Sequence, residues 1–528
     1  MTDRDKLLLA GFSESDLEDI RARGITFGDI LAQINSIRKG IPPIKLIKPC
    51  TMGDGIIKLT SDAYHKYIEF HTEGEKQGRF LKFVPASGAA SRMFKKLLSI
   101  YNNQENLSSE GLRKLAQAGD SEAKAVCEFV DNLENFAFYD DLKNALKKDG
   151  IDPENLTKED NYRLILKYIL TETGLNYSNL PKGSIKFHKY SGGSRTAFEE
   201  HLAEAVQYSA NKKGFVSVHF TLSPEHVDEV TAFLESVRNK FEPDRQKLLI
   251  THSTQSPSTD TIALTKQNKP FRNNDGSLLF RPGGHGALLK NLNELEGDII
   301  FIKNIDNVVP EHLRADTILY KKLLAGLLIF LQNKIFGFLK SLKEENLTVE
   351  LRTDIKYFIS EWFPYLSTDL AENKSDAIDY LIRVLNRPLR VCGVVKNVGH
   401  PGGGPFWVLE DDGSVSLQIV ESAQIDGSDE SQVKFFNSST HFNPVDLVCG
   451  VKDFQGKSFN LLKYRNPDTG LVTVKSKDGD ELKALELPGL WNGSMAYWNT
   501  VFVEVPLSTF APVKEVNDLL KKEHQPSE

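Results

Sequence analysis

The sequence predicts an α/β protein with a mostly parallel central sheet, helical insertions and a β-rich C-terminal part. Short apolar runs alternate with helix-like stretches in the first 310 residues, which is typical of βαβ units with parallel strands. These runs are residues 80–86, 215–221, 247–253 and 298–305. Later in the chain, strand-like runs dominate. They lie at residues 389–395, 406–409, 416–420, 447–451 and 498–505. The chain has 528 residues, of which 40% are hydrophobic, so it is long and apolar enough for more than one average domain.

The order of these patterns divides the chain into four parts. Residues 1–75 form a helical preface, and residues 76–310 form an α/β core that contains a helical insertion at about 98–179. Residues 311–388 are a second helical insertion without a strand pattern. Residues 389–528 complete the core and end in a helix after Pro512.

Composition excludes several classes of protein. With 65 basic and 72 acidic residues the net charge is −7, which predicts no nucleic-acid partner and no anionic membrane surface as partner. The four cysteines form no CxxC pair, so a zinc site or a disulfide framework is not expected. The first residues, MTDRDKLLLAGF, lack the basic region of a signal peptide, and the longest apolar run, residues 323–331, is about half of a membrane span. We therefore expect a cytoplasmic protein.

The first candidate site is the turn that follows the strand at 80–86. The small residues Ala86, Ser87 and Gly88 allow backbone N–H groups to approach a polyphosphate, and the helix start that follows favours anions. Arg92 would bind phosphate oxygens through its guanidinium. An ordinary strand–helix turn with a surface arginine fits the same residues.

A second basic residue, Lys182, follows the first helical insertion in Leu-Pro-Lys-Gly. By itself this tetrapeptide carries little information. With the insertion removed, however, the chain reads glycine-containing turn, arginine, helix and Pro-Lys. In this order it resembles the nucleotide-diphospho-sugar transferase superfamily, of Rossmann-like fold, and within it the UDP-glucose/UDP-sugar pyrophosphorylases.

Further motifs follow in the order of that family. Gln255 in Gln-Ser-Pro corresponds to a base-contacting glutamine, and Gly284 and His285 lie in Pro-Gly-Gly-His-Gly, similar to the family's nucleotide-binding Pro-Gly-His-Gly. Asp306 ends an apolar strand, at the edge of a parallel sheet where α/β proteins bind ligands. By resemblance, Asp306 is the aspartate that coordinates Mg²⁺, which prefers carboxylate and phosphate oxygens.

The resemblance extends to the end of the chain. His-Phe-Asn-Pro-Val-Asp-Leu places Asn443 at a sugar-side asparagine, and Leu-Glu places Glu486 at another sugar-side position. Phe-Ala-Pro-Val-Lys is close to the family's Phe-Leu-Pro-Val-Lys, so that Lys514 would contact the sugar 1-phosphate. Single matches have ordinary explanations, such as turns, strand edges and an exposed lysine.

The resemblance implies a Mg²⁺-dependent nucleotidyltransferase that converts a sugar 1-phosphate and a nucleoside triphosphate, with UTP favoured, to a nucleotide sugar and pyrophosphate. Arg92, Lys182 and Lys514 would be the catalytic residues. The phosphate loop has fewer glycines than the family's Gly-Gly-Leu-Gly-Thr, and Ala287 stands where the branch has an acid. These departures and the two insertions predict a separate bacterial branch whose domain has no known function.

Two other functions fit the same sequence. One is a nucleotide-sugar-dependent glycosyltransferase, which also uses an aspartate and a divalent metal but does not release pyrophosphate. The other is a catalytically silent protein that binds or senses nucleotide sugars. The sequence identifies neither the sugar nor the base, and it leaves the oligomeric state open.

Overall fold

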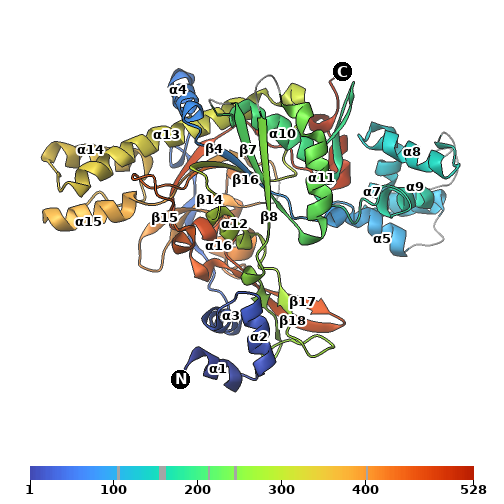
Figure 1. Cartoon of the computed structure of the whole chain (residues 1–528), viewed down its shortest axis with the longest axis horizontal. Helices are drawn as coiled ribbons and strands as arrows, with labels where there is room; N and C mark the ends of the chain where they lie inside the picture. The colour runs from blue at the N-terminus through green and yellow to red at the C-terminus, as the bar shows by residue number, and fades with distance from the viewer. Residues whose placement is uncertain (104–107, 154–161, 212–213, 243–246, 400–401, 528) are drawn as a thin grey trace. The chain divides into compact units, whose positions relative to one another are not determined.

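The computed structural model describes residues 1–103, 108–153, 162–211, 214–242, 247–399 and 402–527, drawn in Figure 1. The chain folds into two compact units, each made of segments that are distant in the sequence. Unit 1 comprises Met1–Gly74, Gln255–Ile302 and Lys322–Val505, and unit 2 comprises Glu75–Thr254, Lys303–Lys321 and Pro506–Glu528. The four-part division of the sequence remains a prediction.

Unit 2 is built on three parallel strands in the order β4-β7-β8. These are β4 (Phe80–Pro85), β7 (Phe215–Leu222) and β8 (Lys247–Thr254). Helix α10 (Ala197–Tyr208) contacts β7 and α11 (Val227–Val237), and its first turn is closed by a reciprocal capping box between Thr196 and Glu199. A small hairpin, β5 (Lys186–Tyr190) and β6 (Gly193–Thr196), precedes α10.

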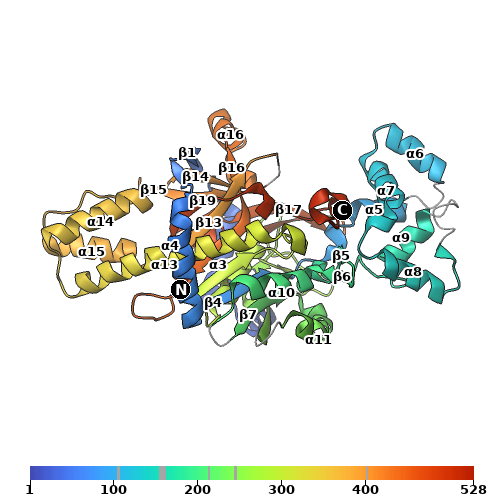
Figure 2. The same ribbon diagram turned by 90° about the horizontal axis from the view of Figure 1, so that it is seen from above.

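The described part of the first predicted insertion consists of helices joined by turns, with no strand. Its helices are α5 (Lys95–Asn103), α6 (Ser109–Gln117), α7 (Ser121–Asp131), α8 (Tyr139–Lys148) and α9 (Tyr162–Leu170). They lie together as one cluster in both views (Figures 1 and 2). Apolar side chains at helical spacing, including Leu97, Val126, Phe129 and Ile169, are buried in one core with Val84 and Val218 of the strands. The apolar core of the insertion is therefore continuous with that of its own unit.

Unit 1 contributes strands in the order β2-β3-β19-β13-β16-β12. Their bounds are β2 (Thr51–Met52), β3 (Gly55–Ile57), β19 (Asn499–Glu504), β13 (Leu389–Lys396), β16 (His441–Gly450) and β12 (Ile299–Lys303). The pairs β2–β3, β3–β19 and β13–β19 are parallel, and β13–β16 is antiparallel. The predicted fold class, α/β with a mostly parallel central sheet and a β-rich C-terminal part, is confirmed.

Smaller sheets and helices complete unit 1. The strands are β1 (Lys45–Pro49), β14 (Gly404–Leu409), β15 (Val415–Val420), β9 (Thr261–Ile262), β10 (Leu264–Thr265), β11 (Phe280–Arg281), β17 (Leu471–Lys477) and β18 (Asp480–Glu486). The helices are α1 (Asp3–Leu9), α2 (Glu14–Ala22), α3 (Phe27–Lys39), α4 (Ser61–Gln77), α12 (Leu288–Asn293), α13 (Ala315–Lys343), α14 (Val349–Trp362), α15 (Lys374–Leu385) and α16 (Glu430–Asn437). Helices α14 and α15 lie side by side in both views (Figures 1 and 2).

Three sequence-based expectations need correction. The helical preface also contains the short strands β1, β2 and β3. Strand β16 begins at His441 instead of Leu447, because a shift in its pairing with β13 and a positive φ of 60° at Val445 accommodate Pro444 within the strand. The C-terminal helix is replaced by two 3-10 turns, Val516–Leu520 and Lys522–His524.

Helix α13 contains the apolar run predicted to be too short for a membrane span. The complete helix has 29 residues and, by length and composition alone, could cross a membrane, but 61% of its most apolar window is buried. Leu324 and Leu327 are fully buried, and the backbone of Tyr67 lies directly against Gly326. Most of the apolar window of α13 is therefore buried against the rest of the protein, as in a core helix.

Candidate functional site

The loop after β4, predicted to bind phosphate, is open to solvent at its tip. The N–H of Ala86 donates to the carbonyl oxygen of Thr221 at 3.1 Å, which fixes the start of the loop to the end of β7. Ser87 is half-buried, whereas Gly88 is exposed, and a Cβ added at Gly88 would meet no atom within 4 Å. The loop therefore presents backbone to free space at the carboxyl ends of parallel strands, where α/β proteins bind ligands.

The fold brings this loop together with the Pro-Lys motif that follows the helical insertion. The N–H of Lys182 donates to the carbonyl oxygen of Gly88 at 3.0 Å, and the N–H of Ala90 donates to that of Leu180 at the same distance. These backbone bonds make the two motifs one structural element. The loop and Lys182 are therefore adjacent in the fold, although the helical insertion separates them in the sequence.

Asp306 lies at the centre of the site and is contacted by two of the predicted lysines. Its Oδ2 accepts hydrogen bonds from Nζ of Lys182 at 2.8 Å and from Nζ of Lys514 at 3.1 Å. The Asp306 and Lys182 side chains are 10% and 13% exposed, whereas that of Lys514 is 57% exposed. The cluster is therefore buried on one side and open on the other.

The electrostatics of the cluster favour the charged form of Asp306. Burial by itself would raise the pKa of Asp306, but the ammonium groups of Lys182 and Lys514 outweigh it and lower that pKa. Burial also lowers the pKa of Lys182, and Asp306 opposes this effect. The second carboxylate oxygen, Oδ1 of Asp306, is buried and has no hydrogen-bond partner. A buried carboxylate oxygen without a partner is uncommon, and a bound cation would satisfy it.

No group of three or more His, Cys, Asp or Glu side chains that could hold a metal is found among the described residues. A cation held by Asp306 would therefore have fewer than three ligands of these types from the described residues, and ligand oxygens would complete its coordination. Mg²⁺ is bound in this way when it accompanies phosphates. The donor set around Asp306 fits the predicted ion.

The segment that carries Lys514 is held to Asp306 through its backbone. The N–H of Val513 donates to the carbonyl oxygen of Asp306 at 3.1 Å. The N–H groups of Lys514 and Glu515 both donate to Oδ2 of Asp518, at 2.7 and 2.8 Å. This carboxylate closes a tight 3-10 turn at the position where a helix was predicted, and it fixes the backbone at Lys514.

Arg92 does not contact Asp306. Its exposed side chain lines a separate cavity of about 190 Å³, together with Lys96 and Glu515, which form an ion pair at 2.7 Å. The N–H of Val516 donates to the carbonyl oxygen of Met93, so the cavity lies between the end of the phosphate loop and the segment that follows Lys514. The structure therefore brings Lys182 and Lys514 to Asp306 and places Arg92 beside the cavity.

A buried polar network beneath the site was not predicted from the sequence. Glu204 on α10 binds two lysines, Lys82 of β4 at 2.6 Å and Lys303 of β12 at 2.5 Å. The sequence does contain a sign of this network, since both lysines interrupt otherwise apolar strands, FLKFVP and IIFIK. A buried lysine requires a buried acid, and α10 supplies it.

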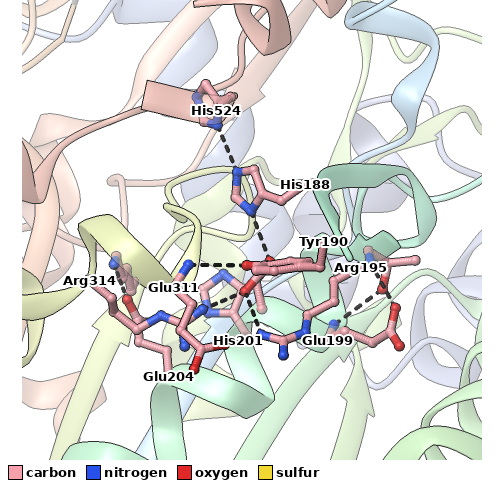
Figure 3. A network of polar contacts seen from close by, with 12 residues as sticks. His188, Tyr190, Arg195, Glu199, His201, Glu204, Glu311, Arg314 and His524 are labelled. Carbon is pink, nitrogen blue, oxygen red and sulfur yellow. Dashed lines mark hydrogen bonds and ion pairs between the residues drawn. The ribbon is translucent and has the colours of Figure 1, made fainter. Parts of the chain in front are cut away.

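The network continues to the C-terminal segment (Figure 3). Glu200 accepts hydrogen bonds from Tyr190 at 2.6 Å and from Arg314 at 2.5 Å, and it bonds Nδ1 of His188 at 2.9 Å. Nε2 of His188 lies 2.9 Å from Nδ1 of His524 (Figure 3). One carboxylate thus anchors both segments that supply Asp306 and Lys514 to the site.

Unit 1 contains the residues predicted to bind the base and the sugar. Gly284 has a φ of 72°, and a Cβ added to it would lie 3.5 Å from the carboxylate of Glu486. The ring of His285 packs against Trp491 at a tilt of 31°, with ring centroids 4.3 Å apart, and its Nδ1 accepts from the N–H of Leu490. Burial lowers the pKa of His285. The predicted Gly-His loop and Glu486 therefore come together.

Two other predicted residues of unit 1 have their own partners. Gln255 donates to Asp260 at 3.5 Å. Asn443 is buried, its Nδ2 donates to the carbonyl oxygen of Gly393 at 2.8 Å, and its Oδ1 accepts from the N–H of Val445 at 2.9 Å. The amide of Asn443 is thus committed to the irregular part of β16.

Comparison with known proteins identifies a family. Residues 13–525 match the family described as "Domain of unknown function (DUF4301)". The chain belongs to this family. The prediction of a family without a known function is confirmed, and a search of curated proteins found no match.

The solved structures that this chain resembles include UDP-sugar pyrophosphorylases. The UDP-N-acetylglucosamine pyrophosphorylase of Trypanosoma brucei is 13% identical, with 98% of this chain and 84% of that chain covered and a TM-score of 0.46. The UDP-glucose pyrophosphorylase of Leishmania major is 12% identical, with coverages of 97% and 80% and a TM-score of 0.42. A putative UDP-N-acetylglucosamine pyrophosphorylase of Entamoeba histolytica is 12% identical, with coverages of 89% and 84% and a TM-score of 0.43.

Proposed function

We propose that this protein is a sugar-phosphate nucleotidyltransferase, which joins a sugar 1-phosphate to the nucleotidyl group of a nucleoside triphosphate and releases pyrophosphate. The observation that carries the proposal is the cluster of Lys182, Lys514 and Asp306 beside the exposed backbone of the phosphate loop. The two ammonium groups are suited to a polyphosphate, and the carboxylate, with one oxygen that has no hydrogen-bond partner, is suited to its counterion.

The two lysines have different surroundings and therefore different proposed roles. Lys182 is nearly buried and joined to the loop by its backbone, so it would hold the triphosphate and the departing pyrophosphate. Lys514 is more exposed and would turn toward the sugar 1-phosphate, orienting its oxygen for in-line attack on the α-phosphorus. The reaction needs no covalent intermediate, so the work of the protein is positioning and neutralising charge.

Asp306 is the proposed holder of Mg²⁺ through its unpartnered Oδ1. When bound, the ion would neutralise the negative charge of the phosphate oxygens. We assign Arg92 to the outer part of the phosphate site, since its side chain faces the neighbouring cavity. Gln255, Gly284 and His285 are proposed for the base, with UTP favoured, and Asn443 and Glu486 for the sugar, all on the strength of the motif resemblance.

The decisive experiment measures pyrophosphate release from the purified protein with Mg²⁺, across a panel of nucleoside triphosphates and hexose 1-phosphates. We expect release with at least one pair, and a loss of about 10²- to 10³-fold in turnover for Lys182→Met or Lys514→Met. Lys522→Met is the matched control, since Lys522 is an exposed lysine on the same C-terminal segment.

Each alternative gives a different result in the same assay. A glycosyltransferase would release a nucleoside diphosphate from a nucleotide sugar, without pyrophosphate. A silent binding protein would bind nucleotides without turnover. Unchanged turnover in both lysine variants would contradict the proposed site even if pyrophosphate were released.

A further inference from the structure

Unit 1 contains a large cavity that no predicted site residue lines. Its volume is about 970 Å³, within the range of small-molecule sites. It lies between the C-terminal end of α15, the turn that joins β14 and β15, and the residues just before β19. Every residue that lines it belongs to unit 1.

One wall of the cavity carries two arginines without acidic partners. Among the described residues, neither Arg383 nor Arg387 forms an ion pair. Arg387 uses its Nε to donate to the carbonyl oxygen of Arg383 at 3.1 Å, which leaves the ends of its guanidinium free. Burial lowers the pKa of Arg387, so this charge is held in partly desolvated surroundings. Arg383 is exposed at the same wall, and together the two guanidinium groups are suited to a phosphate.

A second wall is aromatic. Trp407, Tyr497 and Trp498 line the cavity, and Tyr497 is 39% exposed, whereas Trp498 is 3% exposed. Nζ of Lys48 lies over the ring of Trp407, and the guanidinium of Arg383 lies over the ring of Tyr380. Tyr497 therefore offers the most accessible ring for stacking on a flat ligand.

The third wall is the turn Glu410–Asp412. Glu410 accepts a hydrogen bond from the hydroxyl of Ser416, and burial raises its pKa. Asp411 and Asp412 are exposed at the rim. Carboxylates in these positions can accept hydrogen bonds from the hydroxyl groups of a ligand.

We propose that this cavity binds a nucleoside phosphate. This class of ligand has a flat base, neighbouring ribose hydroxyls and a phosphate, which match the aromatic, acidic and arginine walls. A free sugar phosphate matches only two of the three walls, because it has no flat ring.

The position of the cavity makes it an effector site. The parallel strands β13 and β19 both begin beside it, with Leu389 paired to Asn499. Ligands that react in α/β proteins bind at the carboxyl ends of parallel strands, and this cavity lies at the amino ends. A nucleotide bound here would regulate the protein or report nucleotide supply, whatever reaction the Asp306 site performs.

The test measures the equilibrium binding of AMP, GMP, UMP and CMP by calorimetry and by tryptophan fluorescence. Two of the four tryptophans, Trp407 and Trp498, line the cavity, so we expect the fluorescence to change on binding. The double variant Arg383→Gln/Arg387→Gln should weaken binding by at least about tenfold. Arg38→Gln is the matched control, since Arg38 also lies in the last turn of a helix in unit 1 but outside the cavity.

The same titration in Lys182→Met separates this site from the Asp306 site. We expect nucleotide binding and the fluorescence change to persist in Lys182→Met and to be lost in the double arginine variant. Loss in Lys182→Met with retention in the double variant would overturn the proposal. So would the absence of binding by all four nucleotides, or equal binding by hexose phosphates.

Discussion

Unit 2 contains two carboxylates that each bind two lysines, and they differ mainly in exposure. Glu204 lies between Lys82 and Lys303, and all three side chains are at most 1% exposed. Asp306 lies between Lys182 and Lys514, of which Lys514 is 57% exposed. The first group is closed, and the second is open to a ligand.

The hydrogen bonds show the same contrast. Both carboxylate oxygens of Glu204 are used, Oε2 by Lys82 and Oε1 by Lys303. In Asp306 both lysines share Oδ2, and Oδ1 has no partner. The same combination of charges thus stabilises the fold at Glu204, whereas at Asp306 it leaves one carboxylate oxygen able to bind a ligand. A charged cluster is a candidate site when its hydrogen-bonding capacity is incomplete and solvent can reach it.

The largest effect is expected from Glu204→Gln. It would leave two buried ammonium groups without a counter-charge, and breaking a buried pair of this kind costs about 3–5 kcal/mol of the free energy of unfolding. Urea denaturation followed by circular dichroism measures this loss. Asp306→Asn is the comparison, and we expect less than half the loss, because Lys514 can turn into solvent. Equal losses would show that exposure does not distinguish the clusters.

The effect of a bound ligand on stability should depend on the Asp306 cluster and not on the Glu204 cluster. Pyrophosphate with Mg²⁺ at about 100 times its Kd would stabilise the wild type by about 2.7 kcal/mol. In Asp306→Asn most of this stabilisation should be absent, since the carboxylate that holds the ion is gone. Thermal unfolding with and without the ligand gives the difference for each variant. A full thermal shift in Asp306→Asn would remove Asp306 from the site.

The contrast between the clusters also shows what the sequence could predict. The place of Asp306 at the sheet edge could be predicted because it follows a strand end, and the topology of an α/β sheet gathers such positions at one edge. The place of Lys182 beside it was predicted from the family resemblance. The direction of Arg92 and the bonds of Asn443 could not be predicted, because they depend on partners such as Gly393 that only tertiary packing selects. The 3-10 turn after Lys514 depends in the same way on Asp518, whose carboxylate competes with a helix for the backbone N–H groups.

A moderate effect of pH is expected through His524, which joins the C-terminal segment to Glu200. Burial, with the nearby His188, lowers the pKa of His524 to about 3, from 6.5 for a solvated imidazole. Below pH 6.5 the unfolded chain binds a proton that the folded protein excludes, so stability falls as the pH drops from 6.5 toward 3. One such group changes the free energy of unfolding by up to about 1.4 kcal/mol per pH unit.

His524→Gln should remove that part of the pH dependence and flatten the stability curve between pH 6.5 and 4. Urea denaturation at several pH values measures the slope. His65→Gln is the control, since the side chain of His65 is 85% exposed. A slope equal to that of the wild type in His524→Gln would mean that this histidine is solvated in solution.

The smallest effect on stability is expected at Gly88, in the phosphate loop. A Cβ there would meet no atom within 4 Å, so Gly88→Ala should change the free energy of unfolding by less than about 0.5 kcal/mol. Gly183→Ala is the contrasting variant, because its Cβ would lie 2.5 Å from the ring of Phe198 and must destabilise the fold. If triphosphates approach the backbone of the loop, the methyl group at position 88 will weaken their binding while stability stays unchanged. Calorimetric titration with UTP measures this, and unaltered affinity would place the triphosphate away from Gly88.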